Sequence, residues 1–362
     1  MPMWLHPLND YEQESMRGVL RVGPRQVQVV ELPRPRLEPG TAIVRVRASG
    51  ICGSDLHVYR SNGQPQERPQ GHEVAGEVVE LSPHAGSKSG IREGDLVALD
   101  TICLGRACGA CHWCRAGAFF HCQRKRQGAD WGGAFAEYVK RDMRGLFPLP
   151  AGVSAEEGAL VEPLAVAVHA VRYAAVQPGE SVAIIGAGTI GLTSLLAAVA
   201  MGAGEVYVLA RHPHQAELVG ALGAAAVLTS SPEESAAAVR DRTGGQGADV
   251  VIETVGGEAP TLNQAWSLVR RRGRVVVLGV FGGGVPVNLG TPLGKEATVL
   301  FPACYGEQDG RHDYDVTIDL IASGKAPVAR LLTHRFPLEA APEAFATADD
   351  KRTGAVKVQF AL

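Results

Sequence analysis

The chain has 362 residues, of which 46% are hydrophobic and 20% charged, and its formal net charge is −3. This length favours two domains, each large enough to bury a core. A slightly negative net charge does not attract nucleic acid, so we expect no nucleic-acid partner. No apolar run is long enough to cross a bilayer, so we expect no membrane partner. The amino terminus lacks the basic start and apolar core of a secretory signal, which predicts a cytoplasmic protein.

The first part of the chain reads as short strands separated by Gly and Pro. Residues 1–15 form an N-terminal extension without a useful pattern. Strands are then predicted at 18–22, 26–30, 42–47, 73–81 and 96–99. Short, evenly spaced strands are typical of an irregular antiparallel barrel. We therefore assign residues 16–165 to a β-rich domain.

A different pattern begins at residue 182, where apolar strands alternate with Ala/Leu-rich helical windows. The strands are predicted at 182–185, 206–209, 250–252 and 275–278, and two of the helices at 215–222 and 235–240. This alternation predicts an α/β domain with a doubly wound parallel sheet over residues 166–304. The remaining residues, 305–362, contain helical windows at 316–323 and 343–347 and a strand at 355–360, and are expected to pack back on the first domain.

A glycine-rich turn follows the strand at 182–185 directly and opens a helix. In such a turn the first glycine permits the bend, the second admits a pyrophosphate and the third lets helix pack on strand. The helix amino terminus then faces the phosphates. The predicted dinucleotide-binding residues are Gly186, Gly188, Thr189, Ile190 and Gly191.

The end of the second parallel strand bears on the choice of cofactor. An NAD-binding unit places a carboxylate there for the ribose hydroxyls. Here the strand ends in Ala210, Arg211 and His212, a small residue and two potential cations that suit a 2′-phosphate, so NADP is favoured over NAD. The carboxyl ends of two later strands are expected to line the nicotinamide site through Thr254, Val255, Gly279 and Val280.

Several metal-ligand residue types stand in separated loops of the first domain. A thiolate, an imidazole and a carboxylate can form a three-ligand zinc site that leaves one position for water or substrate. Such a zinc ion is a Lewis acid for alcohol or carbonyl chemistry. The candidates are Cys52, His72, Glu73 and Glu162.

Four of the seven cysteines lie within fifteen residues, at positions 108, 111, 114 and 122. Without a secretory signal, clustered cysteines more often bind metal or do redox chemistry than form disulfides. Four thiolates can close a tetrahedral zinc site with no position for substrate, which predicts a structural zinc at Cys108, Cys111, Cys114 and Cys122 and two zinc ions per chain. The cations at 106, 115 and 124–126 are candidates to offset its negative charge, and Cys103 is a spare buried residue.

Taken in order, these motifs resemble the zinc-dependent medium-chain dehydrogenase/reductase family, in its sorbitol and threonine dehydrogenase branch. The resemblance runs from residue 16 to 362 through GICGSDLH, GHEVAGEVVE, the cysteine lobe, GGAFAEYV, LVEPLAVAVHA, IIGAGTIGL and TGAVKV. It implies a GroES-like barrel beside a Rossmann domain, and a homotetramer or homodimer joined through an edge strand near 285–289.

The resemblance also implies roles for the first-domain residues. Cys52 and His72 bind the catalytic zinc, with Glu73, Glu162 or both as carboxylate ligands. Ser54 takes the substrate proton and passes it through the nicotinamide ribose to His57. Asp55 orients His72.

Two differences from polyol-active relatives argue against a polyol substrate. Cys304 stands where polyol-active relatives carry an Arg, and the segment between His57 and Gly71 is shorter than theirs. We therefore expect an NADP-dependent alcohol dehydrogenase or ketone reductase acting on a small alcohol or carbonyl compound. The alternatives are an NAD-dependent polyol or amino-alcohol dehydrogenase and, more remotely, a non-catalytic dinucleotide-binding protein; a zinc-free quinone reductase would lack the zinc motifs. Trp131 and Tyr138 are either walls of the substrate cleft or core aromatics.

Overall fold

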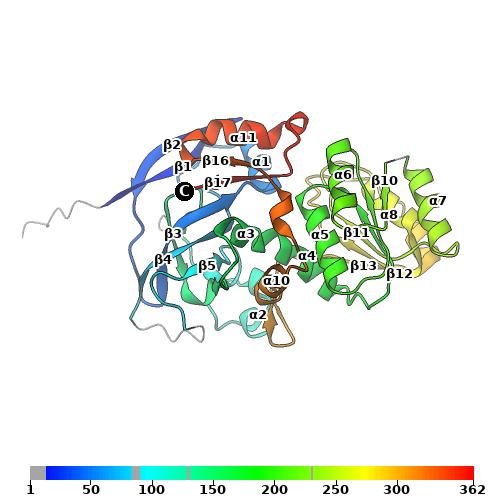
Figure 1. Cartoon of the computed structure of the whole chain (residues 1–362), viewed down its shortest axis with the longest axis horizontal. Coiled ribbons are helices and arrows are strands. Elements are labelled where there is room, and N and C mark those ends of the chain that lie inside the picture. The colour runs from blue at the N-terminus through cyan, green and yellow to red at the C-terminus, as the bar shows by residue number, and fades with distance from the viewer. Residues whose placement is uncertain (1–13, 84–89, 129–130, 230) are drawn as a thin grey trace, which may run out of the picture.

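The computed structural model describes residues 14–83, 90–128, 131–229 and 231–362. The described chain forms two halves (Figure 1), one built from its first and last strands and the other from its middle. Most of the predicted N-terminal extension, residues 1–13, lies outside the described residues, and Ser15 already begins the first strand. The predicted boundary at 165/166 lies inside the helix that joins the halves.

The β-rich half contains a seven-stranded sheet of order β16-β17-β3-β4-β5-β7, with β6 paired to β3, and a separate hairpin of β1 and β2. All of its strand pairs are antiparallel except β16 with β17, a parallel pair that the sequence pattern did not predict. The strands are β1 Ser15–Gly23, β2 Gln26–Pro33, β3 Thr41–Gly50, β4 Glu73–Leu81, β5 Leu96–Leu99, β6 Tyr138–Asp142, β7 Leu146–Pro148, β16 Leu332–Phe336 and β17 Lys357–Ala361. The helices are α1 Gly53–Arg60, α2 His112–Arg115, α3 Ala155–Ala159 and α11 Ala341–Asp349.

The second half contains a six-stranded, fully parallel sheet of order β10-β9-β8-β11-β12-β13, which confirms the predicted doubly wound fold. Its strands are β8 Val182–Ile185, β9 Val206–Leu209, β10 Ala226–Leu228, β11 Ala248–Glu253, β12 Val269–Val277 and β13 Thr298–Leu300. The helices are α4 Val161–Tyr173, α5 Thr189–Ala200, α6 Pro213–Ala221, α7 Pro232–Arg242, α8 Thr261–Leu268, α9 Gly290–Lys295 and α10 Asp313–Ala322, and a short pair, β14 Glu307–Gln308 and β15 Arg311–His312, precedes α10.

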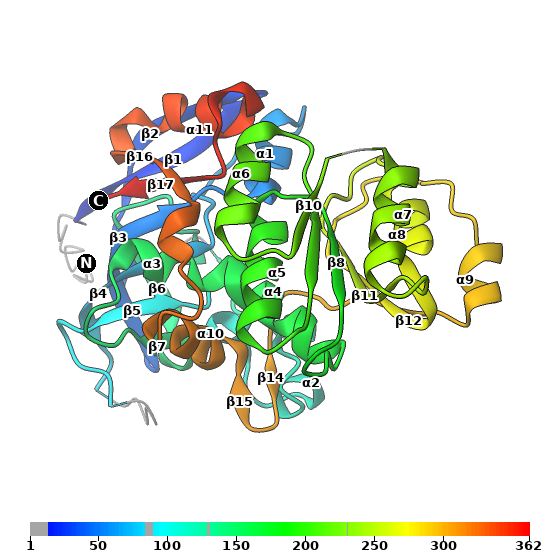
Figure 2. The ribbon, with the colours of Figure 1, turned by 45° about the vertical axis from the view of Figure 1, so that its right-hand side comes forward.

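Alternation along β8 explains why both faces of this sheet are covered by helices. Val182 and Ile184 belong to the core cluster that includes residues of α4 and α5. Ala183 and Ile185 belong to a second cluster that includes Trp266 of α8 and residues of α7. Because successive side chains of a strand point to opposite faces, an unbroken apolar strand requires two helical layers, and Figure 2 shows helices on both sides of the sheet.

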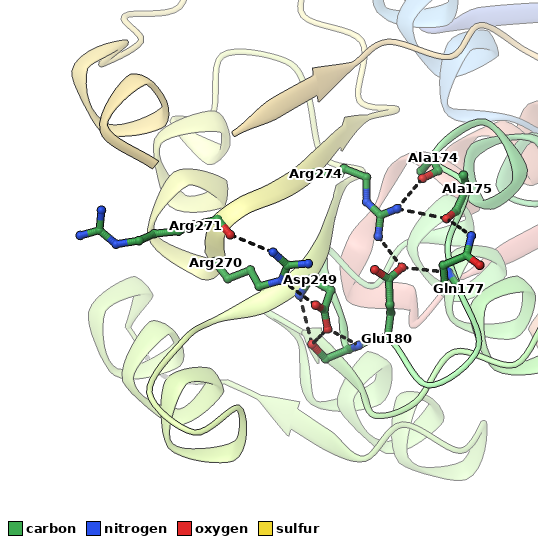
Figure 3. A network of polar contacts seen from close by, with 9 residues as sticks. Ala174, Ala175, Gln177, Glu180, Asp249, Arg270, Arg271 and Arg274 are labelled. Atoms are coloured by element: carbon green, nitrogen blue, oxygen red, sulfur yellow. Dashed lines mark hydrogen bonds and ion pairs between the residues drawn. The ribbon is translucent and has the colours of Figure 1, made fainter. Parts of the chain in front are cut away.

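A polar network fixes the start of the parallel sheet to the end of α4 (Figure 3). The guanidinium of Arg274, on β12, donates to the carbonyl oxygens of Ala174 and Ala175 at 3.0 Å each, and also pairs with Glu180. These contacts cap the orphan carbonyls at the carboxyl end of α4. Since α4 links the halves, the network holds the sheet in a fixed relation to that helix.

Residues 332–362, from β16 onward, return to the first half. β17 pairs with β3, and α10 packs on α4, where Asp313 accepts from Arg172 at 2.6 Å and lies 2.8 Å from His169. The expected edge strand near 285–289 is wrong, because those residues form no strand. The edges of the parallel sheet are β10 and β13, as its strand order shows.

Candidate active site and metal centres

Strand register brings the predicted catalytic residues together. Gly50, at the end of β3, lies opposite Glu73 at the start of β4 and opposite Gln359 of β17. Cys52 follows as the N-cap of α1, and the ligand atoms of Cys52, His72 and Glu73 all lie within 4.8 Å of one another. A Cβ on Gly50 would come within 2.1 Å of the Glu73 carboxylate, so this position must be glycine.

Glu73 has a partner that the sequence patterns did not reveal. Lys357, on β17, donates to both carboxylate oxygens of Glu73 at 2.6 Å and to the carbonyl of Ile51 at 3.1 Å. Both side chains are 1% exposed, so the pair is fully desolvated. A buried ion pair needs this kind of additional hydrogen bond to offset desolvation.

Glu162, the other candidate carboxylate, comes from the first turn of α4 and is also buried. Burial raises its pKa to about 7, against the lowering effect of His72. Within the described ranges its carboxylate makes no hydrogen bond or ion pair. Two carboxylates therefore lie near the site, one held by Lys357 and one without a protein partner.

The surroundings of His72 suit a metal ligand. Its Nδ1 lies 3.9 Å from Asp55, whose other oxygen accepts the Cys52 N–H at 2.9 Å. Burial opposes protonation of His72, but the charges of Asp55 and Cys52 outweigh it and raise its pKa well above the usual value. With Nδ1 facing Asp55, the ring offers Nε2 to a metal, the usual carboxylate–histidine arrangement.

A cleft of about 760 Å³ opens beside this cluster. Ser54, His72 and Trp131 line it, so Trp131 is a wall residue, although it is largely buried. Tyr138 does not line this cleft and lies under the guanidinium of Arg34. His57 is exposed on the last turn of α1, one turn beyond Ser54.

The cysteine lobe gathers its four thiols from two short turns around α2. Their sulfurs lie within 4.8 Å of one another, with Cys111 and Cys114 at 3.4 Å and Cys108 and Cys114 at 3.9 Å. Zinc–sulfur bonds of about 2.3 Å in a tetrahedron place sulfurs about 3.8 Å apart, so the four thiols fit zinc. The Ala110 N–H lowers the pKa of Cys108 to about 6, which favours the thiolate that binds metal. All seven cysteines are free of disulfides.

One cation that interacts with these thiols, Arg144, was not singled out by the sequence. The charges of Cys114 and Cys108 help to raise the pKa of Arg144, after its hydrogen bond to Asp142, and its guanidinium also donates to the Ala107 carbonyl at 2.7 Å. Arg106, Lys125 and Arg126, which we expected to offset the thiolates, line the cleft beside His72.

The predicted cofactor residues gather at the carboxyl ends of four adjacent parallel strands. Gly186, Ala210, Thr254 and Gly279 follow β8, β9, β11 and β12 within two residues. The strand order reverses between β8 and β11, and an open α/β sheet binds its ligand at such a switch point.

The individual residues of this edge differ in exposure. Gly188, Arg211, Val255 and Val280 are exposed, Thr189, Ile190, His212, Thr254 and Gly279 are half-buried, and Gly191 and Ala210 are buried. A Cβ on Gly191 would meet the Gly186 carbonyl at 2.0 Å, so helix α5 packs against its strand only with glycine there. Thr189 donates its hydroxyl to the Val356 carbonyl at 2.9 Å, which joins the cofactor loop to the returning tail.

Comparisons with known proteins agree with this architecture. Residues 38–151 match the alcohol dehydrogenase GroES-like domain, and residues 189–323 match the zinc-binding dehydrogenase domain. L-threonine 3-dehydrogenase of Pyrococcus horikoshii is 34% identical over 96% of this chain and 99% of its own. Sorbitol dehydrogenase of Bacillus subtilis is 31% identical over 95% of this chain and 97% of its own.

A solved structure shows the same fold. A protein of Sinorhizobium meliloti 1021, described as a zinc-binding dehydrogenase and bound to NADP, has a TM-score of 0.83 and 29% identity, covering 97% of this chain and 100% of that one. The chain therefore belongs to the zinc-dependent medium-chain dehydrogenases, in the branch of the sorbitol and threonine dehydrogenases. It is an oxidoreductase that acts on CH–OH groups. No helix in the described part of the chain is long and apolar enough to span a membrane.

Proposed function

We propose that this chain transfers hydride between NADP(H) and a secondary alcohol or its ketone, at a zinc site formed by Cys52, His72 and a carboxylate. The observation that carries the proposal is the convergence of these donors at a cleft that Ser54 also lines. An NAD-dependent polyol or amino-alcohol dehydrogenase is the second candidate, favoured by the likeness to the threonine and sorbitol enzymes.

The donor set suits a reactive zinc ion, which, when bound, supplies a Lewis acid that lowers the pKa of an alcohol or polarises a carbonyl. Cys52 and His72 would hold the ion, Asp55 would orient the His72 ring, and Lys357 restrains Glu73, which would be available as a carboxylate ligand. A second zinc at the four thiols of the lobe holds that segment together.

Proton movement follows helix α1. Ser54, which lines the cleft, would take the proton of the substrate hydroxyl, and His57, exposed one turn further along the helix, would exchange a proton with water. The Gly186–Gly191 loop would hold a nicotinamide cofactor, which would supply hydride-transfer chemistry when bound.

Preference for NADP rests on the residues after β9. That strand is followed by no carboxylate within three residues, and Arg211 is exposed without an ion pair to any described residue. His214 adds a third nitrogen-bearing side chain, stacked at 5.7 Å on His212. A 2′-phosphate between these side chains forms charge-assisted hydrogen bonds, whereas a ribose hydroxyl finds no acceptor.

Initial rates with NADP and NAD over a panel of secondary alcohols, sorbitol and L-threonine test the proposal. Arg211→Gln is expected to raise KM for NADP by about 10–100-fold, the worth of a charged hydrogen bond, and to leave KM for NAD unchanged. Arg240→Gln, another exposed arginine of the same half, is the matched control. Turnover with NAD alone would establish the second candidate, and absence of turnover with either cofactor in protein holding two zinc ions would overturn both.

We also propose that the chain forms a homo-oligomer through the β13 edge. Apolar side chains are exposed around this edge, with Leu289 at 70%, Leu293 at 80% and Phe301 at 67% exposure. An apolar patch beside an unpaired strand is typical of an interface with a second copy. Light scattering should show a dimer or tetramer that Phe301→Glu dissociates; a wild-type monomer would overturn this.

A further inference from the structure

The cleft beside His72 is strongly cationic. Five cations line it from four separate segments of the chain: Arg68, Arg106, Lys125, Arg126 and Arg141. Among the residues that the structure describes, the only carboxylates in its lining are Asp55 and Glu67. Asp55 accepts a hydrogen bond from the Cys52 N–H and lies beside His72, so it does not pair with these cations.

Within the described part of the chain, only one of these five cations has a carboxylate partner. Arg126 lies 3.4 Å from Asp142. The other four make no ion pair with any residue that the structure describes. Their partners are backbone carbonyls and one ring: Arg68 donates to Gly128 at 2.8 Å, Arg106 to Trp131, Arg141 to Lys140 at 2.6 Å and to Gly132 at 2.8 Å, and Lys125 lies over Phe120.

Arg141 makes the excess charge costly. Its side chain is wholly buried, and its Nε, like the Nε of Arg106, is buried without a hydrogen-bond partner. Burial and the nearby Arg106 lower the pKa of Arg141, and Asp100 acts in the opposite direction. The oxygens of Asp100 accept three backbone N–H groups, from residues 102, 103 and 104. Burying a guanidinium that has no carboxylate at ion-pair distance costs desolvation free energy. An anion bound in the cleft would offset part of that cost.

The phosphates of the dinucleotide do not account for these cations. None of the residues of the Gly186–Gly191 loop lines the cleft, whereas Ser54 and His72 do. The cations therefore line the same cleft as Ser54 and His72, where the alcohol would lie under the proposed function. At about 760 Å³ the cleft is within the range of roughly 300–1,000 Å³ for small-molecule sites, with room for a group beyond the reacting carbon.

We propose that the substrate is an anionic alcohol or ketone, whose phosphate or carboxylate group is held by Arg68, Arg106 and Arg141 while its hydroxyl reaches Ser54. Guanidinium groups bind both anions through paired hydrogen bonds. This inference rests on the proposed function, since it names the substrate class of the same cleft.

Matched substrates test it. Sorbitol is compared with sorbitol 6-phosphate and with gluconate, which add a phosphate or a carboxylate to a similar carbon chain. We expect kcat/KM to be at least about tenfold higher for one of the anions and to fall with ionic strength. Inorganic phosphate and acetate, added as competitive inhibitors, then distinguish a phosphate from a carboxylate substrate.

Arginine variants assign the effect to the cleft. Arg106→Gln and Arg68→Gln should raise KM for the anionic substrate by about 10–100-fold and so lower the ratio of its kcat/KM to that of sorbitol. Arg68 is exposed and far in sequence from the cysteine lobe, so its variant guards against misfolding at Arg106 or Arg141. Arg124→Gln, an exposed arginine outside the cleft lining, is the control.

Two results separate this inference from the proposed function. If neutral alcohols turn over as well as the anions, and Arg68→Gln behaves as Arg124→Gln does, the anionic substrate class is overturned and the dehydrogenase proposal stands. If no alcohol turns over, calorimetry with inorganic phosphate and with acetate on the zinc-loaded protein still decides the matter. Binding of either that Arg106→Gln and Arg68→Gln weaken supports the anion site, and binding of neither overturns it.

Discussion

The two clusters of metal-ligand side chains differ in how the chain assembles them. The cysteine lobe collects four thiols from fifteen consecutive residues, and its sulfurs fill a tetrahedron by themselves. The Cys52 cluster collects a thiol, an imidazole and a carboxylate from α1 and β4, next to α4 and β17, and opens on a cleft. A metal that stiffens a loop needs only local sequence, whereas a metal that reacts needs an open position and neighbours supplied by the whole sheet.

The charges around the clusters differ in the same way. Arg144, beside the lobe thiols, is partly exposed and bound to Asp142. Lys357, beside the Cys52 cluster, is buried with Glu73 as its counter-ion. Arg144 is partly solvated, whereas Lys357 is not. We therefore expect loss of Cys52 to affect chemistry most, loss of Lys357 to affect both chemistry and stability, and substitutions of the lobe thiols to affect stability alone.

The largest effect is expected from Cys52→Ser. Mutation of a residue that only supports a metal ligand typically lowers activity roughly 10–100-fold. Loss of the ligand Cys52 itself should lower kcat/KM by more than that. The thermal unfolding midpoint should change little, because Cys52 lies at the start of α1, outside the core clusters. Metal analysis should fall from two zinc ions to one. A variant that keeps its activity, or that unfolds as easily as Cys111→Ser, would contradict the division between the sites.

Next in size is Lys357→Met. Removing one member of a buried ion pair leaves Glu73 uncompensated, at a cost of about 3–5 kcal/mol in unfolding free energy. Activity should fall by about 10–100-fold, because Glu73 loses the group that positions it. Lys351→Met, at an exposed lysine six residues away, is the control for losing a lysine. Equal stability of the two variants would show that the pair contributes nothing.

A smaller effect, on stability alone, is expected from Cys111→Ser. Weakening the four-thiol site should cost more than about 3 kcal/mol, or roughly 6–12 °C in Tm. Hydrogen exchange should rise in residues 103–122 and stay unchanged at Cys52. Activity per zinc-loaded molecule should persist well below the melting temperature. Loss of activity without a change in exchange would reverse the assignment of the two sites.

The local cluster was also the more predictable one. The spacing of Cys108, Cys111, Cys114 and Cys122 predicted their convergence, because a short loop leaves the thiols little choice of partner. The alternation of apolar strands and helices likewise predicted β8, β9, β11 and β12, since each is buried on both faces.

Residues whose role depends on strand pairing were not predictable. Lys357 lies in a polar-apolar strand pattern, and only the pairing of β17 with β3 brings it to Glu73, more than 280 residues away in sequence. Lys140, Arg141 and Asp142 lie in a short strand, β6, and three charged residues in a row argue against burial, yet all three are buried. The expected edge strand at 285–289 was wrong for the same reason, since edge position depends on neighbours that a local pattern does not specify.

The smallest expected effect is the pH dependence of stability that comes from His312. Its ring stacks on Phe119 of the cysteine lobe, at 5.8 Å between ring centres. Burial lowers the pKa of His312 from 6.5 to about 4. The native state therefore resists protonation while the unfolded chain accepts it below pH 6.5. The stability that neutral His312 contributes is complete above pH 6.5 and is lost as the pH falls toward 4.

His312→Phe isolates this contribution. The ring packing persists, and the lost N-cap bond to Tyr314 costs about 1 kcal/mol at every pH. Between pH 7.5 and 5.5 the wild type should lose about 1 kcal/mol relative to the variant, measured by urea unfolding. Asp100, whose pKa burial raises to about 6, has the opposite sign but is common to both chains, so its contribution largely cancels in the difference. His121→Phe, at an exposed histidine of the lobe, is the control and should show the same change in unfolding free energy with pH as the wild type. If His312→Phe also shows that change, His312 is protonated in the native state and this part of the lobe is open to water.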